Sequence, residues 1–370
     1  MVGPSSSWTR RHRAALSLVL LTGLAACEQA TGPAAGNKLD TQAALADYKA
    51  MQDVFATSGW AGFQALGGRS PLASTAAVGA VAGLPGLSTR HSGRDFAVGF
   101  FRELAAARTG GTTLARTVIS PVHLGRTLVY DPVLDRYVID PRRTGAPANG
   151  TRFIIYEVDA AGRPIVAREI GHADLLDEGG STGNAITLRL IVVERGRTIL
   201  DYRTRADLRA DGGEIDVEGF VQDAQGTRLA FTIDVAARQV AGETRIDADF
   251  ELAVTPRGFT AVGKVRGVKE GEGGDGTISL TLRHGENSLR VEMEERDQQL
   301  DGAIQLNGNP FVTVTGNAKS PTLRGPTGQP LTEQELLVVV AIVSMSDDVF
   351  DLVEDLVKPV EKLLLLGWVL

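Results

Sequence analysis

Histidine is the side chain that most often acts as a general base or a metal ligand near neutral pH, and this chain has five. The four that follow His12 are isolated, and none lies three or four positions from another: His91, His123, His172 and His284. His172 has the densest acidic surroundings, with Asp174, Asp177 and Glu178 close in sequence. Such a cluster could hold a metal ion, but a histidine in a solvated loop explains it better. We therefore expect no metal site and no catalytic residue.

Paired carboxylates are a second arrangement that can do acid–base chemistry. Two pairs have their members two residues apart, Asp247 with Asp249 and Glu292 with Glu294. On an extended strand this spacing places both side chains on one face, so we interpret each pair as the solvent-facing side of a strand. The glycine-rich run at residues 271–276 lacks the lysine and the strand-to-helix setting of a phosphate-binding loop. A hairpin loop explains it, and no cofactor is predicted.

The elements that carry most of these side chains are predicted strands. From Glu243 to Val254, apolar and charged residues alternate with a period of two, as on a strand with one buried face. The apolar members are Ile246, Ala248, Phe250 and Leu252, and the charged members are Arg245, Asp247, Asp249 and Glu251. Similar runs follow one another through residues 126–318. They are separated by turn-forming steps such as Arg195-Gly196 and Asn307-Gly308.

Short links of this kind cannot cross over a sheet, so we expect neighbouring strands to be antiparallel. Residues 126–318 then form a meander of about twelve to fourteen strands. Its apolar face must be covered by helices, by a second sheet or by curling of the sheet itself. The predicted fold class is mainly β with helical ends (α+β). We expect a large curved antiparallel meander sheet, or an open barrel, packed against N- and C-terminal helices.

Residues 40–125 are predicted to form a helical N-terminal region. Apolar residues at helical spacing indicate helices from Thr41 to about Thr57 and from Asp95 to Ala107. Glycines from Gly59 onward are expected to break helical structure, and a tract rich in alanine, glycine and serine predicts a mobile loop at residues 67–92.

Residues 319–370 are predicted to form helices docked on the apolar face of the sheet. Thr332 and Glu335 have the spacing of a capping box, which marks a helix start. The apolar run at residues 336–343 is too short to span a membrane, so we expect it to be buried. Ser346 is predicted to cap a second helix.

Composition excludes several classes of function. The chain of 370 residues is 43% apolar and 22% charged, so it is globular in type and can bury a large core. Its net charge of −7, without a cluster of lysine and arginine, makes nucleic acid an unsuitable partner. A single cysteine, Cys27, excludes an internal disulfide and a metal site made of several cysteines.

The N-terminus explains this cysteine. Basic residues at positions 10–13 precede an apolar stretch at residues 14–26, which has the length of an export signal and is too short to span a membrane. The stretch closes with Leu24-Ala25-Ala26-Cys27. This motif resembles the lipobox of bacterial lipoproteins. The resemblance implies that residues 1–26 are a signal peptide, cleaved before Cys27, and that Cys27 carries acyl chains such as palmitate. The alternative is an ordinary secreted protein cut near Ala26.

The same resemblance implies a lipid-anchored protein of the bacterial cell envelope, which we expect at the outer membrane. Residues 27–39 would then be a flexible tether between the lipid and the fold. We favour a non-enzymatic lipoprotein that holds a lipid or another hydrophobic ligand in its curved sheet. In outline this fold is similar to periplasmic lipid-carrier lipoproteins, which are half-barrels closed by helices. The alternative is a structural or partner-binding lipoprotein whose own helices fill the core. An enzyme ranks last because no catalytic group of residues emerges.

Overall fold

The computed structural model describes most of the predicted sheet and little of the chain before it. The described residues are 57–67, 119–179, 185–209, 211–241, 243–269, 275–297, 299–317 and 320–333, with single positions 46, 53, 335, 336, 338, 339, 342, 346 and 349. Cys27, the rest of residues 1–39, the helix expected from Asp95 to Ala107 and nearly all of the loop expected at 67–92 lie outside them. Of the helix expected from Thr41 to Thr57, Ala46 and Asp53 are described as helical.

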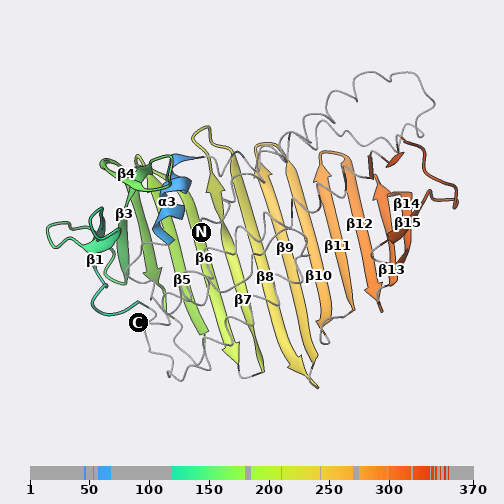
Figure 1. Cartoon of the computed structure of the whole chain (residues 1–370), viewed down its shortest axis with the longest axis horizontal. Coiled ribbons are helices and arrows are strands. Elements are labelled where there is room, and N and C mark those ends of the chain that lie inside the picture. Colours follow the sequence, from blue (N-terminus) through green and yellow to red (C-terminus); the bar gives the residue numbers. More distant parts are fainter. Residues whose placement is uncertain are drawn as a thin grey trace, which may run out of the picture. The chain divides into compact units, whose positions relative to one another are not determined.

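One sheet of fifteen strands makes up most of the described residues (Figure 1). In chain order its strands are β1 (Arg126–Asp131), β2 (Arg136–Ile139), β3 (Gly150–Val158), β4 (Pro164–Asp177), β5 (Ala185–Glu194), β6 (Arg197–Arg209), β7 (Gly212–Gln222), β8 (Arg228–Val240), β9 (Glu243–Thr255), β10 (Phe259–Lys269), β11 (Gly276–His284), β12 (Asn287–Arg296), β13 (Gln299–Leu306), β14 (Asn309–Asn317) and β15 (Ser320–Arg324). From β3 to β15 each strand pairs with the next in sequence. A mainly β fold built on an antiparallel meander is thus confirmed, and β2 and β15 are the edges of a sheet that does not close.

The pairing of β1 with β3 is the exception to the antiparallel pattern. Arg126 lies opposite Thr151 and Leu128 opposite Phe153 in a parallel register, while β1 and β2 form an antiparallel hairpin. Our prediction that all neighbours are antiparallel is wrong at this point. The reason is that residues 132–149, which include the whole of β2, serve as a crossover long enough to return the chain beside β1.

Two-residue turns join strands where the sequence predicted them. Asn307 (φ 51°) and Gly308 (φ 76°) link β13 to β14, and Arg195 (φ 48°) and Gly196 (φ 80°) link β5 to β6. Positive φ at both central residues is the geometry of a type I′ turn, whose twist matches that of the flanking strands. Such turns fix the register of consecutive strands, and the register decides on which face each side chain lies.

The sheet has one apolar face and one charged face. On β8 the large buried side chains are Leu229, Phe231, Ile233 and Val235. Ile233 lies opposite Val217 on β7 and Phe250 on β9, so apolar residues continue across neighbouring strands. Thr232 and Asp234, which alternate with them, are exposed. Because each large aliphatic side chain contributes about 1.5–3 kcal/mol when buried, the apolar face supplies most of the stability.

Helix α3 (Ser58–Gly67) packs mainly on β3. Thr57 caps its start, because the Thr57 hydroxyl accepts a hydrogen bond from the backbone N–H of Trp60 at 3.1 Å. We predicted that glycines break helical structure here, and that prediction is wrong. A Cβ at Gly62 would lie 2.4 Å from Cγ2 of Ile155 and 2.7 Å from the carbonyl oxygen of Tyr156. The missing side chain therefore allows the helix to approach the sheet closely.

The sheet continues beyond residue 318, where the sequence pattern placed its end, because β15 extends it to Arg324. Pro321 concealed this strand, since proline is tolerated in a sheet essentially only at an edge. The capping box that follows is confirmed. The Glu335 carboxylate accepts a hydrogen bond from the Thr332 N–H at 2.8 Å, and the Glu335 N–H donates to the Thr332 hydroxyl at 3.3 Å.

Three described residues of the C-terminal part, Val339, Ile342 and Val349, are buried in the same hydrophobic core as the strands. Ser346 is helical, and its hydroxyl donates to the Ile342 carbonyl oxygen at 2.8 Å. This bond to the preceding turn is typical of a residue inside a helix, so the prediction that Ser346 caps a second helix is wrong. Within the described ranges, no helix combines the length and the apolar character needed to cross a membrane.

Candidate binding surface

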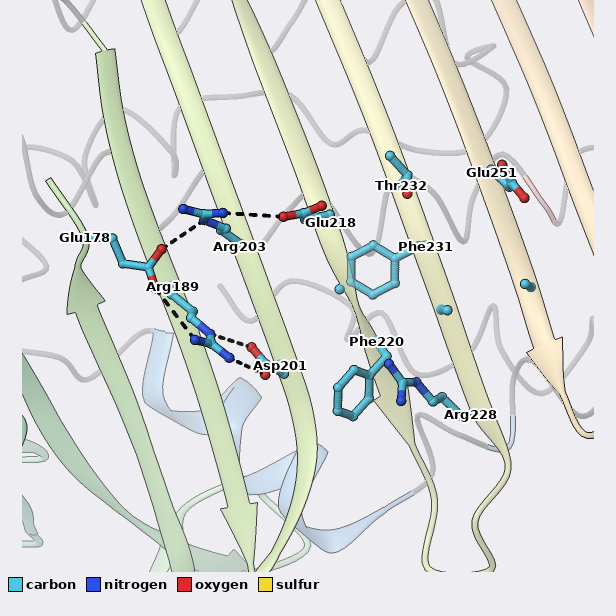
Figure 2. A pocket seen from close by; sticks show the side chains of 13 residues that line it. Glu178, Arg189, Asp201, Arg203, Glu218, Phe220, Arg228, Phe231, Thr232 and Glu251 are labelled. Atoms are coloured by element: carbon cyan, nitrogen blue, oxygen red, sulfur yellow. Dashed lines mark hydrogen bonds and ion pairs between the residues drawn. The ribbon is translucent and has the colours of Figure 1, made fainter. Parts of the chain in front are cut away.

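The charged face of the sheet is hollowed across strands β5 to β9 (Figure 2). The hollow has a volume of about 700 Å³. Its charged lining consists of three arginines and four carboxylates: Arg189, Arg203, Arg228, Glu178, Asp201, Glu218 and Glu251. We call this region the charged-face hollow.

The hollow arises from side-chain size. Ala230 on β8 lies opposite Ala253 on β9, and Thr232 lies opposite Glu251. Thr232 stands between the long arginines on β5 and β6 and the Glu251 side chain on β9 (Figure 2), and Ala230 and Ala253 line the same hollow. Because the backbone of a paired sheet has no gap, a depression on its face appears where short side chains are in register and long ones surround them.

A network of ion pairs holds the side of the hollow formed by Glu178, which follows β4, and by strands β5 to β7. The Arg189 guanidinium binds the Asp201 carboxylate through two hydrogen bonds of 2.8 and 2.7 Å. Glu178 lies between two arginines (Figure 2), 2.9 Å from Nε of Arg203 and 3.7 Å from Arg189. Arg203 also lies 3.7 Å from Glu218. Side chains bound to each other in this way are held in defined positions before any ligand arrives.

An aromatic ring lies on the same charged face. Phe220 lies on the same face of β7 as three charged residues at alternate positions before it, Glu214, Asp216 and Glu218. The guanidinium of Arg228 lies 3.7 Å from the centre of its ring (Figure 2). A cation over an aromatic face is attracted by the negative potential of the ring. Phe220 is half-buried, so it gives the hollow an apolar contact within a polar lining.

A second depression of about 450 Å³ adjoins the first and shares Arg203, Glu218 and Thr232 with it. It contains Asp216 and Asp234, which lie directly opposite each other on β7 and β8. Partial burial is the main cause of a raised pKa at both carboxyl groups. The neighbouring carboxylates of Asp216 and Asp249 raise the pKa of Asp234 further, and no cation lowers it.

Both carboxylate pairs singled out in the sequence lie on the charged face. Arg266 approaches Asp247 at 2.9 Å and Asp249 at 2.7 Å. Glu292 pairs with Arg290 and Glu294 with Arg296, each at 2.5 Å. Neither pair belongs to the charged-face hollow. Their ion pairs on an exposed face agree with our interpretation of them as the outer side of strands.

His172 does not lie in a loop, as the sequence suggested, but inside β4. Its Nε2 atom is 3.8 Å from the Asp174 carboxylate, which Arg152 binds through two hydrogen bonds of 2.7 Å each. Burial, with the positive charge of Arg152, lowers the pKa of His172. His123 lies just before β1 with its pKa lowered by burial, His284 ends β11, and His91 is outside the described residues. In the described part of the chain no group of three or more His, Cys, Asp or Glu side chains could hold a metal ion.

Sequence reasoning missed the hollow and most of its residues. One signal was available in the sequence. Phe220 is aromatic, although it stands at a position of β7 where the alternating pattern otherwise places charged residues. The contact of Arg228 with Phe220 depends on the β7–β8 register, in which Gln222 pairs with Arg228. Asp223 sets that register by accepting hydrogen bonds from the backbone N–H groups of Gln225 and Thr227. Such a turn is not evident from strand periodicity.

Comparisons of the chain with protein-family models, with curated proteins and with solved structures find no match. The fold and the surface therefore define only a class: an open antiparallel β sheet with one buried apolar face and one hollowed charged face.

Proposed function

We propose that this chain is a non-enzymatic lipoprotein of the bacterial cell envelope. It is held at the outer membrane by acyl chains on Cys27 and binds another envelope component through the charged face of its sheet. One observation carries the choice of binding face. The apolar face of the sheet is buried within the protein, whereas the hollow opens on the charged face.

The burial of the apolar face favours a partner-binding protein over a lipid carrier. Leu229, Leu252 and Leu280 have no exposed surface. A carrier needs an apolar cavity or groove for its ligand. The charged-face hollow instead presents arginines and carboxylates, whose removal from water beneath a lipid chain would cost free energy without new hydrogen bonds. We therefore prefer the self-filled core to the lipid-holding sheet that the sequence favoured.

The proposal includes helical segments from both ends of the chain that cover the apolar face of a curved sheet. Two observations support it. Helix α3 packs on β3, and Val339, Ile342 and Val349 are buried in the core that the strands form. Covering by the protein's own chain would leave the charged face as the accessible side.

The absence of enzymatic activity is supported by the way the charged side chains of the hollow are used. A general base must be available to the proton that it removes. Asp201 is bound by Arg189 through two hydrogen bonds, and Glu178 lies between Arg189 and Arg203. These carboxylates therefore serve to hold the surface in shape.

The proposal is tested by purifying the protein and its Cys27→Ala variant from a bacterial envelope grown with a clickable palmitate analogue. We expect the wild-type protein to be labelled, to sediment with membrane and to carry an acyl mass on its N-terminal residue. The variant should lose all three properties, while Thr31→Ala should keep them. A variant that is still labelled and still sediments contradicts the anchor. Lipid bound non-covalently at one molecule per chain, measured by native mass spectrometry, contradicts the self-filled core.

A further inference from the structure

The charged-face hollow has a composition that points to a class of ligand. Its three arginines and four carboxylates leave a charge close to zero, so a highly charged polymer gains little from it. We propose that the hollow binds a carbohydrate, as a polyhydroxylated chain lying across strands β5 to β9. This inference rests on the proposed function and names the ligand class of the same surface.

The polar groups of the hollow match the hydrogen-bonding capacity of sugars. A hydroxyl group donates one hydrogen bond and accepts others, so adjacent hydroxyls can bind a guanidinium and a carboxylate at the same time. Arg189 and Asp201 form such a neighbouring pair, joined by bonds of 2.8 and 2.7 Å. Arg203 and Glu178 form another at 2.9 Å. Because these groups hold each other in place, a ligand does not have to order them on binding.

Phe220 supplies the apolar contact that a sugar ring needs. The C–H groups on one face of a sugar ring carry slight positive charge, and an aromatic face is negative. Phe220 lies in the same hollow as Arg189 and Asp201 (Figure 2), and Arg228 holds it from a distance of 3.7 Å. Phe220 is not part of the apolar core. Arg228 covers one face of its ring, so a sugar ring would stack on the opposite face.

The extent of the surface fits a chain better than a single small molecule. The hollow of about 700 Å³ adjoins the depression of about 450 Å³ and shares three residues with it. The hollow alone has the volume typical of a small-ligand site, about 300–1,000 Å³, and the adjoining depression extends the surface along the same strands. Arg203 and Glu218, where the two depressions meet, are 53% and 64% exposed. The surface is therefore open to solvent along its length and can accept an internal stretch of an oligosaccharide.

A basic peptide is the competing ligand. Asp216 and Asp234 would attract positive charge, and they lie in the adjoining depression. However, Arg205 stands directly opposite Asp216, and Arg203 borders both depressions. The positive charges of these arginines repel a cationic partner, whereas a neutral partner is not repelled.

The test uses the full mature chain on a printed array of neutral and charged bacterial oligosaccharides, followed by fluorescence polarisation with the strongest neutral binder. We expect binding that changes little between low and physiological salt, because uncharged hydroxyls are not screened. Phe220→Ala should weaken it by about tenfold or more. Phe220→Tyr keeps the ring and should retain binding. Glu292→Gln, on the same face but outside the hollow, should leave it unchanged.

Three outcomes overturn the inference. The first is that no oligosaccharide on the array binds at millimolar concentration, and the second is that binding survives Phe220→Ala in a folded variant. The third is that a lysine-rich peptide binds in place of the oligosaccharides, with an affinity that falls steeply as salt is added. None of these outcomes alters the acylation of Cys27 or the lipid content of the protein, so a failure of the carbohydrate proposal is distinct from a failure of the proposed function.

Discussion

At the scale of single residues, the negative charges on the charged face are not offset equally by positive side chains at every position. Asp216, Asp234 and Asp249 lie opposite one another across β7, β8 and β9. Like charges directly opposite each other in a sheet are destabilising. Asp249 is offset by Arg266 at 2.7 Å, whereas the pKa of Asp234 is raised by burial and by its carboxylate neighbours alone. Asp234 is thus a residue that costs stability at neutral pH.

Replacing Asp234 with asparagine should therefore stabilise the fold. A cross-strand pair of this kind is typically worth about 0.2–1 kcal/mol, and we expect Asp234→Asn to raise the free energy of unfolding by that amount at neutral pH. Chemical denaturation followed by circular dichroism measures the change. Asp247→Asn is the matched control, because Asp247 is paired with Arg266 at 2.9 Å and its removal should give no gain.

The pH dependence of this gain has a definite sign. The folded-state pKa of Asp234 lies above its usual value, so the folded protein holds the proton more tightly than the unfolded chain does. The cost of the ionised carboxylate is present above the raised pKa and disappears as the pH falls through it. The advantage of Asp234→Asn should shrink over the same acid range. An advantage that grows on acidification would contradict the assigned cause.

At the scale of elements, the contact between α3 and the sheet depends on two glycines that differ in their neighbours. A Cβ at Gly62 would meet Cγ2 of Ile155 and the backbone oxygen of Tyr156. A Cβ at Gly59 would meet Cδ1 of Ile199 and Oε2 of Glu194, which are the ends of flexible side chains. Backbone cannot move aside without shifting β3, whereas a side-chain end can rotate away.

The two glycines should therefore respond differently to the same substitution. Alanine favours a helix over glycine by about 0.5–1 kcal/mol, but overpacking typically costs about 1–3 kcal/mol. We expect Gly62→Ala to lower the free energy of unfolding by up to about 2.5 kcal/mol, because the overpacking cost outweighs the helix gain there. Gly59→Ala should be near neutral. Thermal melting of both variants measures the difference, and equal effects would show that α3 does not approach β3 as described.

Strand periodicity was enough to predict most of the sheet and failed at identifiable places. Between Glu243 and Val254 the alternation gives both the strand and its buried face. It failed at β15, where Pro321 looks like a strand breaker, and at β1, whose parallel partner β3 is reached through a crossover. The glycines of α3 were misread because their role depends on residues of β3, β5 and β6 that lie far away in sequence. Local patterns do not contain such contacts.

At the scale of the whole molecule, the strands and the C-terminal part share one core. Ile342 has no exposed surface, whereas Leu336, six positions before it, is 43% exposed. The surface of the charged-face hollow was harder to predict, because Ala230, Thr232 and Ala253 come together only through the β8–β9 register and the charged side chains around them come from three further strands. A sequence gives the alternation on each strand, and the register follows only when every turn between the strands is known.

Shortening Ile342 tests whether the C-terminal part belongs to the folding unit. Truncation of a buried isoleucine to alanine typically costs about 2–5 kcal/mol, and we expect a loss of this size for Ile342→Ala in urea unfolding. Leu336→Ala should change the free energy of unfolding by no more than about 0.5 kcal/mol. If both variants unfold with the midpoint of the wild-type sheet, the C-terminal part is a separate module.

The meander has a consequence for how the molecule can fold and vary. From β4 to β15 every strand bonds only to its neighbours in sequence, so this part of the sheet is in effect a one-dimensional array of hairpins. In such an array, stability is approximately a sum of unit energies and nearest-neighbour couplings, and ordering can begin at any unit and spread both ways. Adding or removing one hairpin preserves the direction of the chain and the alternation of its faces. The number of strands can therefore change by twos without disturbing the five that form the hollow.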